Sequence, residues 1–195
     1  MSDSQAKTTT VLLCGVGGQG TILAADVLAK VAAASGLEVK LSEIHGMSQR
    51  GGSVTTVVRF GSEVSTMVCD LGSADCIVAF EEVEALRNLP FLRRGGRLLV
   101  NAEAIPSLPV QIGAAAMPEA PEERLEAAGA TLIPAGAIAR AQGNPKGMNV
   151  ALVGALSTAL PFAEQTWADV ISKRVPPKTI DANIKTFEAG RAAAR

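Results

Sequence analysis

Two glycine-rich segments contain the residue types best suited to bind a ligand or a partner. Residues 14–20 read Cys-Gly-Val-Gly-Gly-Gln-Gly, between an apolar run and a helical pattern. Glycines at such a turn leave backbone N–H groups accessible, and the positive end of the helix dipole points to the same place. Three of them also fit G-x-G-x-x-G, the dinucleotide fingerprint. The pattern predicts a site for a phosphate or a partner's loop, formed by Gly15, Val16, Gly17, Gly18, Gln19 and Gly20. The alternative is that these glycines only permit a tight turn.

The second segment, residues 45–52, reads His-Gly-Met-Ser-Gln-Arg-Gly-Gly and directly follows a predicted strand. An arginine between a glutamine and two glycines combines a cationic fork with bare backbone, which suits a phosphate or a carboxylate. A long polar loop of this kind also fits an interface contact. The candidate residues here are Ser48, Gln49, Arg50, Gly51 and Gly52.

Other reactive side chains give weaker signals. His45 is the single imidazole of the chain, and a structural hydrogen bond explains it better than catalysis. Cys14 is expected to be a small buried side chain rather than a nucleophile. Glu81 and Glu82 are expected in a solvated first turn of a helix, although they also stand where a crevice would be. Asn149 precedes an apolar helix and is expected either to cap backbone or to reach the first glycine segment.

A dinucleotide site is a poor fit for the whole pattern. Such a site needs an acidic residue at the end of the second strand, where it binds the ribose. Glu43 lies near that position, but its apolar context does not mark it as a ribose ligand. We therefore expect a phosphate or partner contact rather than NAD.

The composition indicates one globular domain, residues 1–195, with few side chains that could act as general acids or bases. Of 195 residues, 48% are hydrophobic and 19% charged, which excludes a disordered chain. The chain has no Tyr, one Trp and one His. This shortage of catalytic side chains favours a binding or accessory role.

Charge, cysteine content and hydropathy exclude several classes of partner. The net charge of −1 gives no electrostatic reason to expect nucleic acid or anionic lipid. Three cysteines without C-x-x-C spacing predict neither a disulfide framework nor an iron–sulfur cluster. No apolar run reaches the ~18 residues that span a bilayer, and residues 1–10 lack the apolar core of a signal peptide. We expect no membrane contact and a cytoplasmic location.

The periodicity predicts an α/β, Rossmann-like three-layer fold with a mixed, mostly parallel sheet and a helical C-terminal end. Residues 8–14, the helix 22–35 and residues 38–44 should form a parallel, right-handed βαβ unit. Residues 53–60 and 63–68 are expected to form a hairpin. In such folds ligands bind beyond the carboxyl ends of the strands, so the two glycine segments are expected to converge. The remaining predicted strands are 74–80, 97–101, 131–134 and a short edge strand at 110–113; the remaining predicted helices are 81–88, 122–128, 135–141, 148–160, 166–174 and 177–194.

With both segments in place, the sequence resembles the gamma-type domain of 2-oxoacid:ferredoxin (or flavodoxin) oxidoreductases. Gly-Val-Gly-Gly-Gln-Gly at 15–20 is similar to the opening motif of that group. Residues 42–54, with His-Gly-Met-Ser-Gln-Arg-Gly-Gly, look like its indolepyruvate branch, the small (beta) subunit type. Phe-Glu-x-x-Glu-Ala-Leu-Arg at 80–87 and the pattern at 178–190 also resemble this branch.

The resemblance implies oxidative decarboxylation of an aryl 2-oxo acid to its aryl-acetyl-CoA, with electrons passed to ferredoxin. In that family thiamine diphosphate, Mg and iron–sulfur clusters supply the chemistry. This sequence has neither cluster spacing nor a Gly-Asp-Gly…Asn element, so those groups are expected on a larger partner subunit, with none bound by this chain alone. If the role of this domain in related enzymes is carried over to this sequence, the CoA phosphates would lie near residues 15–20 and Arg50. The alternative is a stand-alone Rossmann-like protein that binds a nucleotide or CoA.

Overall fold

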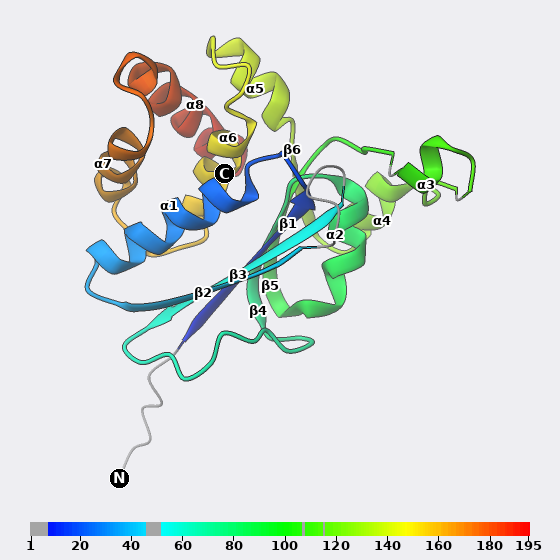
Figure 1. Ribbon diagram of the computed structural model, residues 1–195, viewed down its shortest axis with the longest axis horizontal. Helices are drawn as coiled ribbons and strands as arrows, with labels where there is room; N and C mark the ends of the chain where they lie inside the picture. Colours follow the sequence, from blue (N-terminus) through cyan, green and yellow to red (C-terminus); the bar gives the residue numbers. More distant parts are fainter. Residues whose placement is uncertain (1–7, 46–51, 107, 115) are drawn as a thin grey trace.

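The computed structural model describes residues 8–45, 52–106, 108–114 and 116–195, which form one mixed sheet flanked by helices (Figure 1). The strands are β1 (Thr9–Val16), β2 (Glu38–His45), β3 (Ser53–Gly61), β4 (Ala74–Ala79), β5 (Leu92–Asn101) and β6 (Ala130–Ile133). Their order in the six-stranded sheet is β2-β3-β1-β4-β5-β6. The pairs β1–β4, β4–β5 and β5–β6 are parallel, whereas β3 is antiparallel to both β1 and β2. The expected α/β fold with a mixed sheet is confirmed.

The helices follow the predicted order closely. They are α1 (Thr21–Ala34), α2 (Glu82–Asn88), α3 (Leu108–Gln111), α4 (Pro121–Ala127), α5 (Ala135–Ala141), α6 (Met148–Ser157), α7 (Glu164–Arg174) and α8 (Ile180–Ala193), with 3-10 turns at Leu89–Phe91 and Pro177–Thr179. Gly36 ends α1 with φ +81°, and the N–H groups of Gly36 and Leu37 donate to the carbonyls of Ala33 and Ala32. This is the Schellman arrangement, which satisfies carbonyls at the end of the helix.

The predicted hairpin is wrong, although the sheet is mixed. Residues 63–68 form no strand, because both edges of β3 are already occupied by β1 and β2. The segment instead crosses the sheet, and Arg59 Nη1 donates to the carbonyls of Thr66 and Val68 at 3.2 and 2.9 Å. For the same reason the predicted βαβ unit is only half right: β1 and β2 run in the same direction, but β3 lies between them.

Two smaller expectations also differ from the structure. The segment expected to hold an edge strand at 110–113 contains the short helix α3. Strand β5 begins at Leu92 rather than at Arg97, since Leu92 pairs with Ala74 before a register shift in β4. Glycines 95 and 96 therefore lie inside the strand, at this irregularity, where Gly96 approaches the Ala74 carbonyl.

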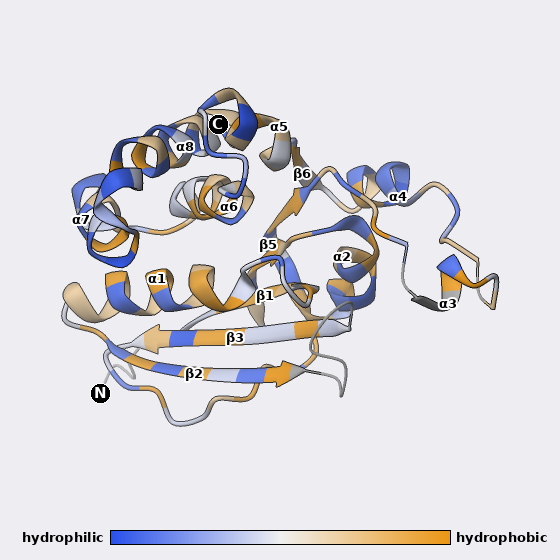
Figure 2. Ribbon diagram, turned by 45° about the horizontal axis from the view of Figure 1, so that its top comes forward, coloured by the Kyte–Doolittle hydropathy of each residue, from blue (hydrophilic) through white to orange (hydrophobic). Residues whose placement is uncertain are grey.

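Alternation along β1 divides the core into two layers. Val11 and Leu13 face a cluster formed with α1, α6, α7 and α8, while Leu12 and Cys14 face a cluster formed with α2 and α4. Figure 2 shows α1 lying along β3 and β2, with the C-terminal helices stacked beyond it. The sheet is thus covered on both faces, and the three-layer expectation is confirmed.

The C-terminal helices pack at one close crossing. A Cβ at Gly154 of α6 would collide with the Phe187 carbonyl, and one at Gly190 of α8 would collide with the Ala151 carbonyl. Trp167 of α7 is fully buried beside this crossing, stacked on Phe187 with ring centroids 6.2 Å apart. Within the part of the chain described, no helix is long and apolar enough to span a membrane.

Candidate functional site

The two glycine segments meet at one edge of the sheet. Because β3 is antiparallel to β1, its first residue, Ser53, lies opposite Val16, the last residue of β1. The backbone N–H of Gly17 donates to the carbonyl of Gly52 at 2.9 Å. The expected convergence is therefore confirmed for the end of the second segment.

A cavity of about 380 Å³ opens beside this junction. The residues that line it come from the first glycine segment, the first turn of α1 and strands β2 and β3: Gly17, Gly18, Gly20, Thr21, Ile22, Glu43 and Val54. Gly18 and Gly20 have φ values of +101° and +86°, which L-residues with side chains rarely adopt. Gly20 is the N-cap of α1, and within the described part of the chain no side-chain hydrogen bond caps this end of the helix. This end of the cavity favours an anion.

Three of the predicted site residues shape the turn without lining the cavity. Gln19 Oε1 accepts from the Val16 N–H at 2.7 Å, and its Nε2 donates to the Phe80 carbonyl at 3.2 Å. A Cβ at Gly15 would stand 2.8 Å from that of Phe80. Gly15, Val16 and Gln19 thus fix the turn against the end of β4, and the cavity is bounded by the glycines that follow.

Asn149 shows both expected contacts: its Oδ1 accepts from the backbone N–H of Val150 at 3.0 Å, and its side chain reaches the first glycine segment. Its side chain is buried at the start of α6, and its Nδ2 lies 2.6 Å from the position of a Cβ at Gly20. Asn149 also lines a shallow second hollow of about 400 Å³, together with Leu23, Asn144 and Lys146.

Most of the second glycine segment lies outside the described residues. This applies to Ser48, Gln49, Arg50 and Gly51, and also to the side chain of His45. Glu43, by contrast, is exposed and lines the cavity. Its carboxylate disfavours a second anion at that end and suits a hydroxyl or amine of a ligand.

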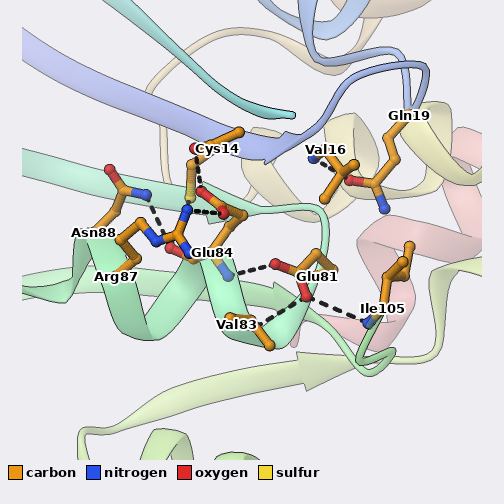
Figure 3. A network of polar contacts seen from close by, with 10 residues as sticks. Cys14, Val16, Gln19, Glu81, Val83, Glu84, Arg87, Asn88 and Ile105 are labelled. Atoms are coloured by element: carbon orange, nitrogen blue, oxygen red, sulfur yellow. Dashed lines mark hydrogen bonds and ion pairs between the residues drawn. The ribbon is translucent and has the colours of Figure 1, made fainter. Parts of the chain in front are cut away.

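The expectation of a solvated acidic turn at 81–82 is wrong. Glu81 and Glu82 are 1% and 6% exposed, and Glu84 of the same turn is 4% exposed. Glu81 caps α2: its carboxylate accepts from the N–H groups of Val83, Glu84 and, from a neighbouring segment, Ile105 (Figure 3). Burial raises the pKa of Glu81 despite these three donors, and burial also raises that of Glu82.

The thiols are not nucleophiles in this environment. Cys14 is fully buried as expected, and burial, with Glu84 and Glu81 nearby, raises its pKa well above the ordinary value. Cys76 is also buried, with its pKa raised to about 12, while Cys69 is half-buried. Cys14 and Cys76 face opposite layers of the core. Among the residues that the structure covers, no three His, Cys, Asp or Glu side chains are grouped to hold a metal ion.

Comparison with known proteins assigns this chain to a family. The pyruvate ferredoxin/flavodoxin oxidoreductase family matches residues 10–193, nearly the whole chain. The chain belongs to this family. The resemblance inferred from the two glycine segments is thereby confirmed.

Individual relatives indicate which members of the family this chain resembles in sequence and fold. The indolepyruvate oxidoreductase subunit IorB of Thermococcus kodakarensis is 41% identical over 196 aligned positions, which cover 97% of each chain. The protein of the same name from Pyrococcus horikoshii is 40% identical with the same coverage. The gamma subunit of a keto/oxoacid ferredoxin oxidoreductase from Geobacter sulfurreducens PCA shares the fold, with a TM-score of 0.69, 22% identity and coverage of 95% of this chain and 98% of that one. The chain is accordingly an oxidoreductase subunit of this family.

Sequence reasoning missed two residues at this edge, Ser53 and Glu84. Ser53 Oγ donates to Glu84 Oε2 at 2.5 Å, from the first residue of β3 to the middle of α2. Arg87 follows Glu84 by three residues, and this spacing indicates an ion pair on the surface of a helix. The spacing does not indicate that the Glu84 carboxylate is buried.

Proposed function

We propose that this chain is the accessory subunit of a heteromeric 2-oxoacid:ferredoxin oxidoreductase of the indolepyruvate type. The complex would convert aryl 2-oxo acids and CoA to aryl-acetyl-CoA and reduce ferredoxin. Its large partner subunit would carry thiamine diphosphate, Mg and the iron–sulfur clusters. The observation that carries the proposal is the full-length similarity to IorB subunits together with the cavity at the two glycine segments.

The described residues do not fit the redox groups. The two buried cysteines face opposite sides of the sheet and have raised pKa values, which oppose the thiolate that a cluster needs. We therefore assign those groups to the partner. What this chain would supply is a binding surface.

The cavity suits the anionic part of CoA. Backbone N–H groups of Gly18 and of the first turn of α1 can meet phosphate oxygens, and the helix dipole adds to the attraction. Arg50, in the second glycine segment, would supply a bidentate cation. Asn149 supports this arrangement by lying against Gly20, the N-cap of α1.

Anaerobic purification of the tagged chain from its native host tests the proposal. We expect a coloured complex with a large thiamine- and cluster-containing chain. The complex should reduce ferredoxin, or a viologen dye in its place, only when indolepyruvate and CoA are both present. Pyruvate and 2-oxoglutarate serve as control substrates.

Two outcomes would contradict the proposal in different ways. A complex that prefers pyruvate or 2-oxoglutarate would retain the family but overturn the indolepyruvate type. A colourless chain without such a partner, yet with saturable nucleotide or CoA binding, would support the stand-alone alternative instead.

A further inference from the structure

A buried carboxylate is bonded to the exit of the second glycine segment. Glu84 is 4% exposed, and its Oε2 accepts the 2.5 Å hydrogen bond from Ser53 Oγ. Glu84 belongs to α2, on the face of the sheet opposite α1. The contact therefore links α2 to the first residue of β3, at the edge where the cavity opens.

From Ser53 the connection to the cavity is short. Ser53 is paired with Val16 in the sheet, and the residue before it, Gly52, accepts the N–H of Gly17. Gly17 itself lines the cavity. The position of Gly52, and with it the direction of the Gly17 N–H, thus depends on where Ser53 is held.

Glu84 is well suited to hold Ser53, because its own position is fixed from several sides. Arg87 Nη1 pairs with its Oε1 at 2.7 Å, and its backbone N–H donates to Glu81. Its carbonyl accepts from Asn88 Nδ2 at 2.9 Å and from Cys14 Sγ at 3.6 Å (Figure 3). A buried acceptor fixed in this way loses little further conformational entropy of its own when it orders a donor.

We propose that Glu84 is a positioning residue for the glycine cavity, acting through Ser53 and the Gly52–Gly17 hydrogen bond. It touches no ligand; it sets the geometry of the backbone that does. The identity of the ligand as CoA rests on the proposed function, but the link from Glu84 to Gly17 does not.

Four variants separate this role from the stability of α2. Ser53→Ala and Glu84→Ala remove the hydrogen bond, whereas Ser53→Thr keeps the hydroxyl and Glu84→Gln keeps an acceptor oxygen. Arg87→Gln is the control for the ion pair alone: it removes the contact of a side chain that is 56% exposed, which contributes little, while the backbone contacts of Glu84 and its bond to Ser53 remain. Thermal unfolding of each full-length variant establishes that it is folded.

Two measurements report on the link. The first is hydrogen exchange at the Gly17 amide in the isolated full-length chain, and the second is the KM for CoA, against kcat, of the assembled complex. Loss of one net intramolecular hydrogen bond corresponds to a change of up to about tenfold. We expect Ser53→Ala and Glu84→Ala to raise both the Gly17 exchange rate and the KM for CoA about tenfold. The Thr, Gln and Arg87 variants should stay near the wild type.

Unchanged Gly17 exchange in folded Ser53→Ala and Glu84→Ala would overturn the inference. Equal losses in Glu84→Gln and Glu84→Ala would also overturn it, since the charge rather than the acceptor would then matter. If the wild-type complex shows no turnover with CoA, the proposed function fails, and the exchange measurement still decides the role of Glu84.

Discussion

The side-chain amide of Asn149 occupies the space that a side chain at Gly20 would need. Its Nδ2 lies 2.6 Å from the ideal Cβ position, and Gly20 also has a φ of +86°. Two independent requirements, backbone conformation and space, thus call for glycine at the N-cap of α1. Gly18, two residues earlier, has φ +101°, and no atom of the described residues lies within 4 Å of its ideal Cβ position, so only the first requirement is shown there.

Replacing Gly20 by alanine is expected to destabilise the fold more than the same change at Gly18. The left-handed conformation costs about 1–2 kcal/mol with a Cβ, and the collision with Asn149 adds about 1–3 kcal/mol. Chemical denaturation of Gly18→Ala and Gly20→Ala measures the difference. Adding Asn149→Ala to Gly20→Ala should recover part of the loss, because the two sites are in contact. Equal losses at the two glycines would show that Asn149 can move away.

The crossing of α6 and α8 gives a second prediction. A Cβ at Gly190 would meet the backbone of Ala151, which cannot rotate out of the way. Gly190→Ala should lower the free energy of unfolding by about 3 kcal/mol or more, through overpacking of a tight contact. Glu188→Ala, on the exposed side of the same helix, is the control and should stay within about 0.5 kcal/mol. The buried Trp167, the single tryptophan, provides the fluorescence signal.

Asp26 gives a pH-dependent prediction. Burial opposes its ionisation, but Lys30 and Arg174 outweigh this effect and lower its pKa; Arg174 Nε lies 2.6 Å from Oδ2. A lowered pKa contributes stability above the unfolded value of about 3.9 that is lost as the pH falls through the folded value. Asp26→Asn should therefore cost about 0.5–1 kcal/mol at pH 7 and progressively less below pH ~4.

Denaturation curves at several pH values check this. Asp70→Asn is the comparison, since Asp70 is exposed and its carboxylate takes part in no ion pair within the described ranges. A constant difference between wild type and Asp26→Asn from pH 7 to pH 3 would contradict the assignment.

Arg50→Ala tests the proposed anion site in the assembled enzyme. Loss of a charge-assisted, bidentate contact should raise the KM for CoA by about tenfold or more with little change in kcat. Arg94→Ala removes an exposed arginine from the start of β5, at the opposite end of the strands from the glycine segments, and should leave the KM unchanged. If Arg50→Ala leaves CoA kinetics unaltered, the second glycine segment is a subunit contact only.

Most helices and strands could be predicted from the sequence, because the local patterns that indicate them are strong. The apolar run of β1, the Gly36 stop of α1 and the helix 135–141 are set by hydrophobic periodicity and glycine placement. The meeting of the two glycine segments followed from the rule that strand ends share an edge. Those inferences needed no knowledge of which strands are neighbours.

Strand order and burial were not predictable in this way. The alternating pattern of 53–60 fits a hairpin partner at 63–68 and an inserted antiparallel strand equally well, and only tertiary packing decides between them. Likewise, acidic residues at the start of a helix are usually solvated, and nothing in the residues 81–84 shows that a neighbouring segment supplies Ile105 as a donor. The Ser53–Glu84 contact spans 31 positions and became visible only in the fold.

The insertion of β3 between β1 and β2 also dictates when the chain can fold during synthesis. Strand β1 is made before β3 and β4 and acquires its two neighbours only after both have been translated, so the centre of the sheet stays open until Ala79 has emerged. Strand β2 is made before β3, its neighbour in the sheet, and cannot pair until β3 has been translated. Apolar β1 is thus exposed on the nascent chain for longer than it would be in a purely sequential sheet. This is the stage at which chaperones would be needed.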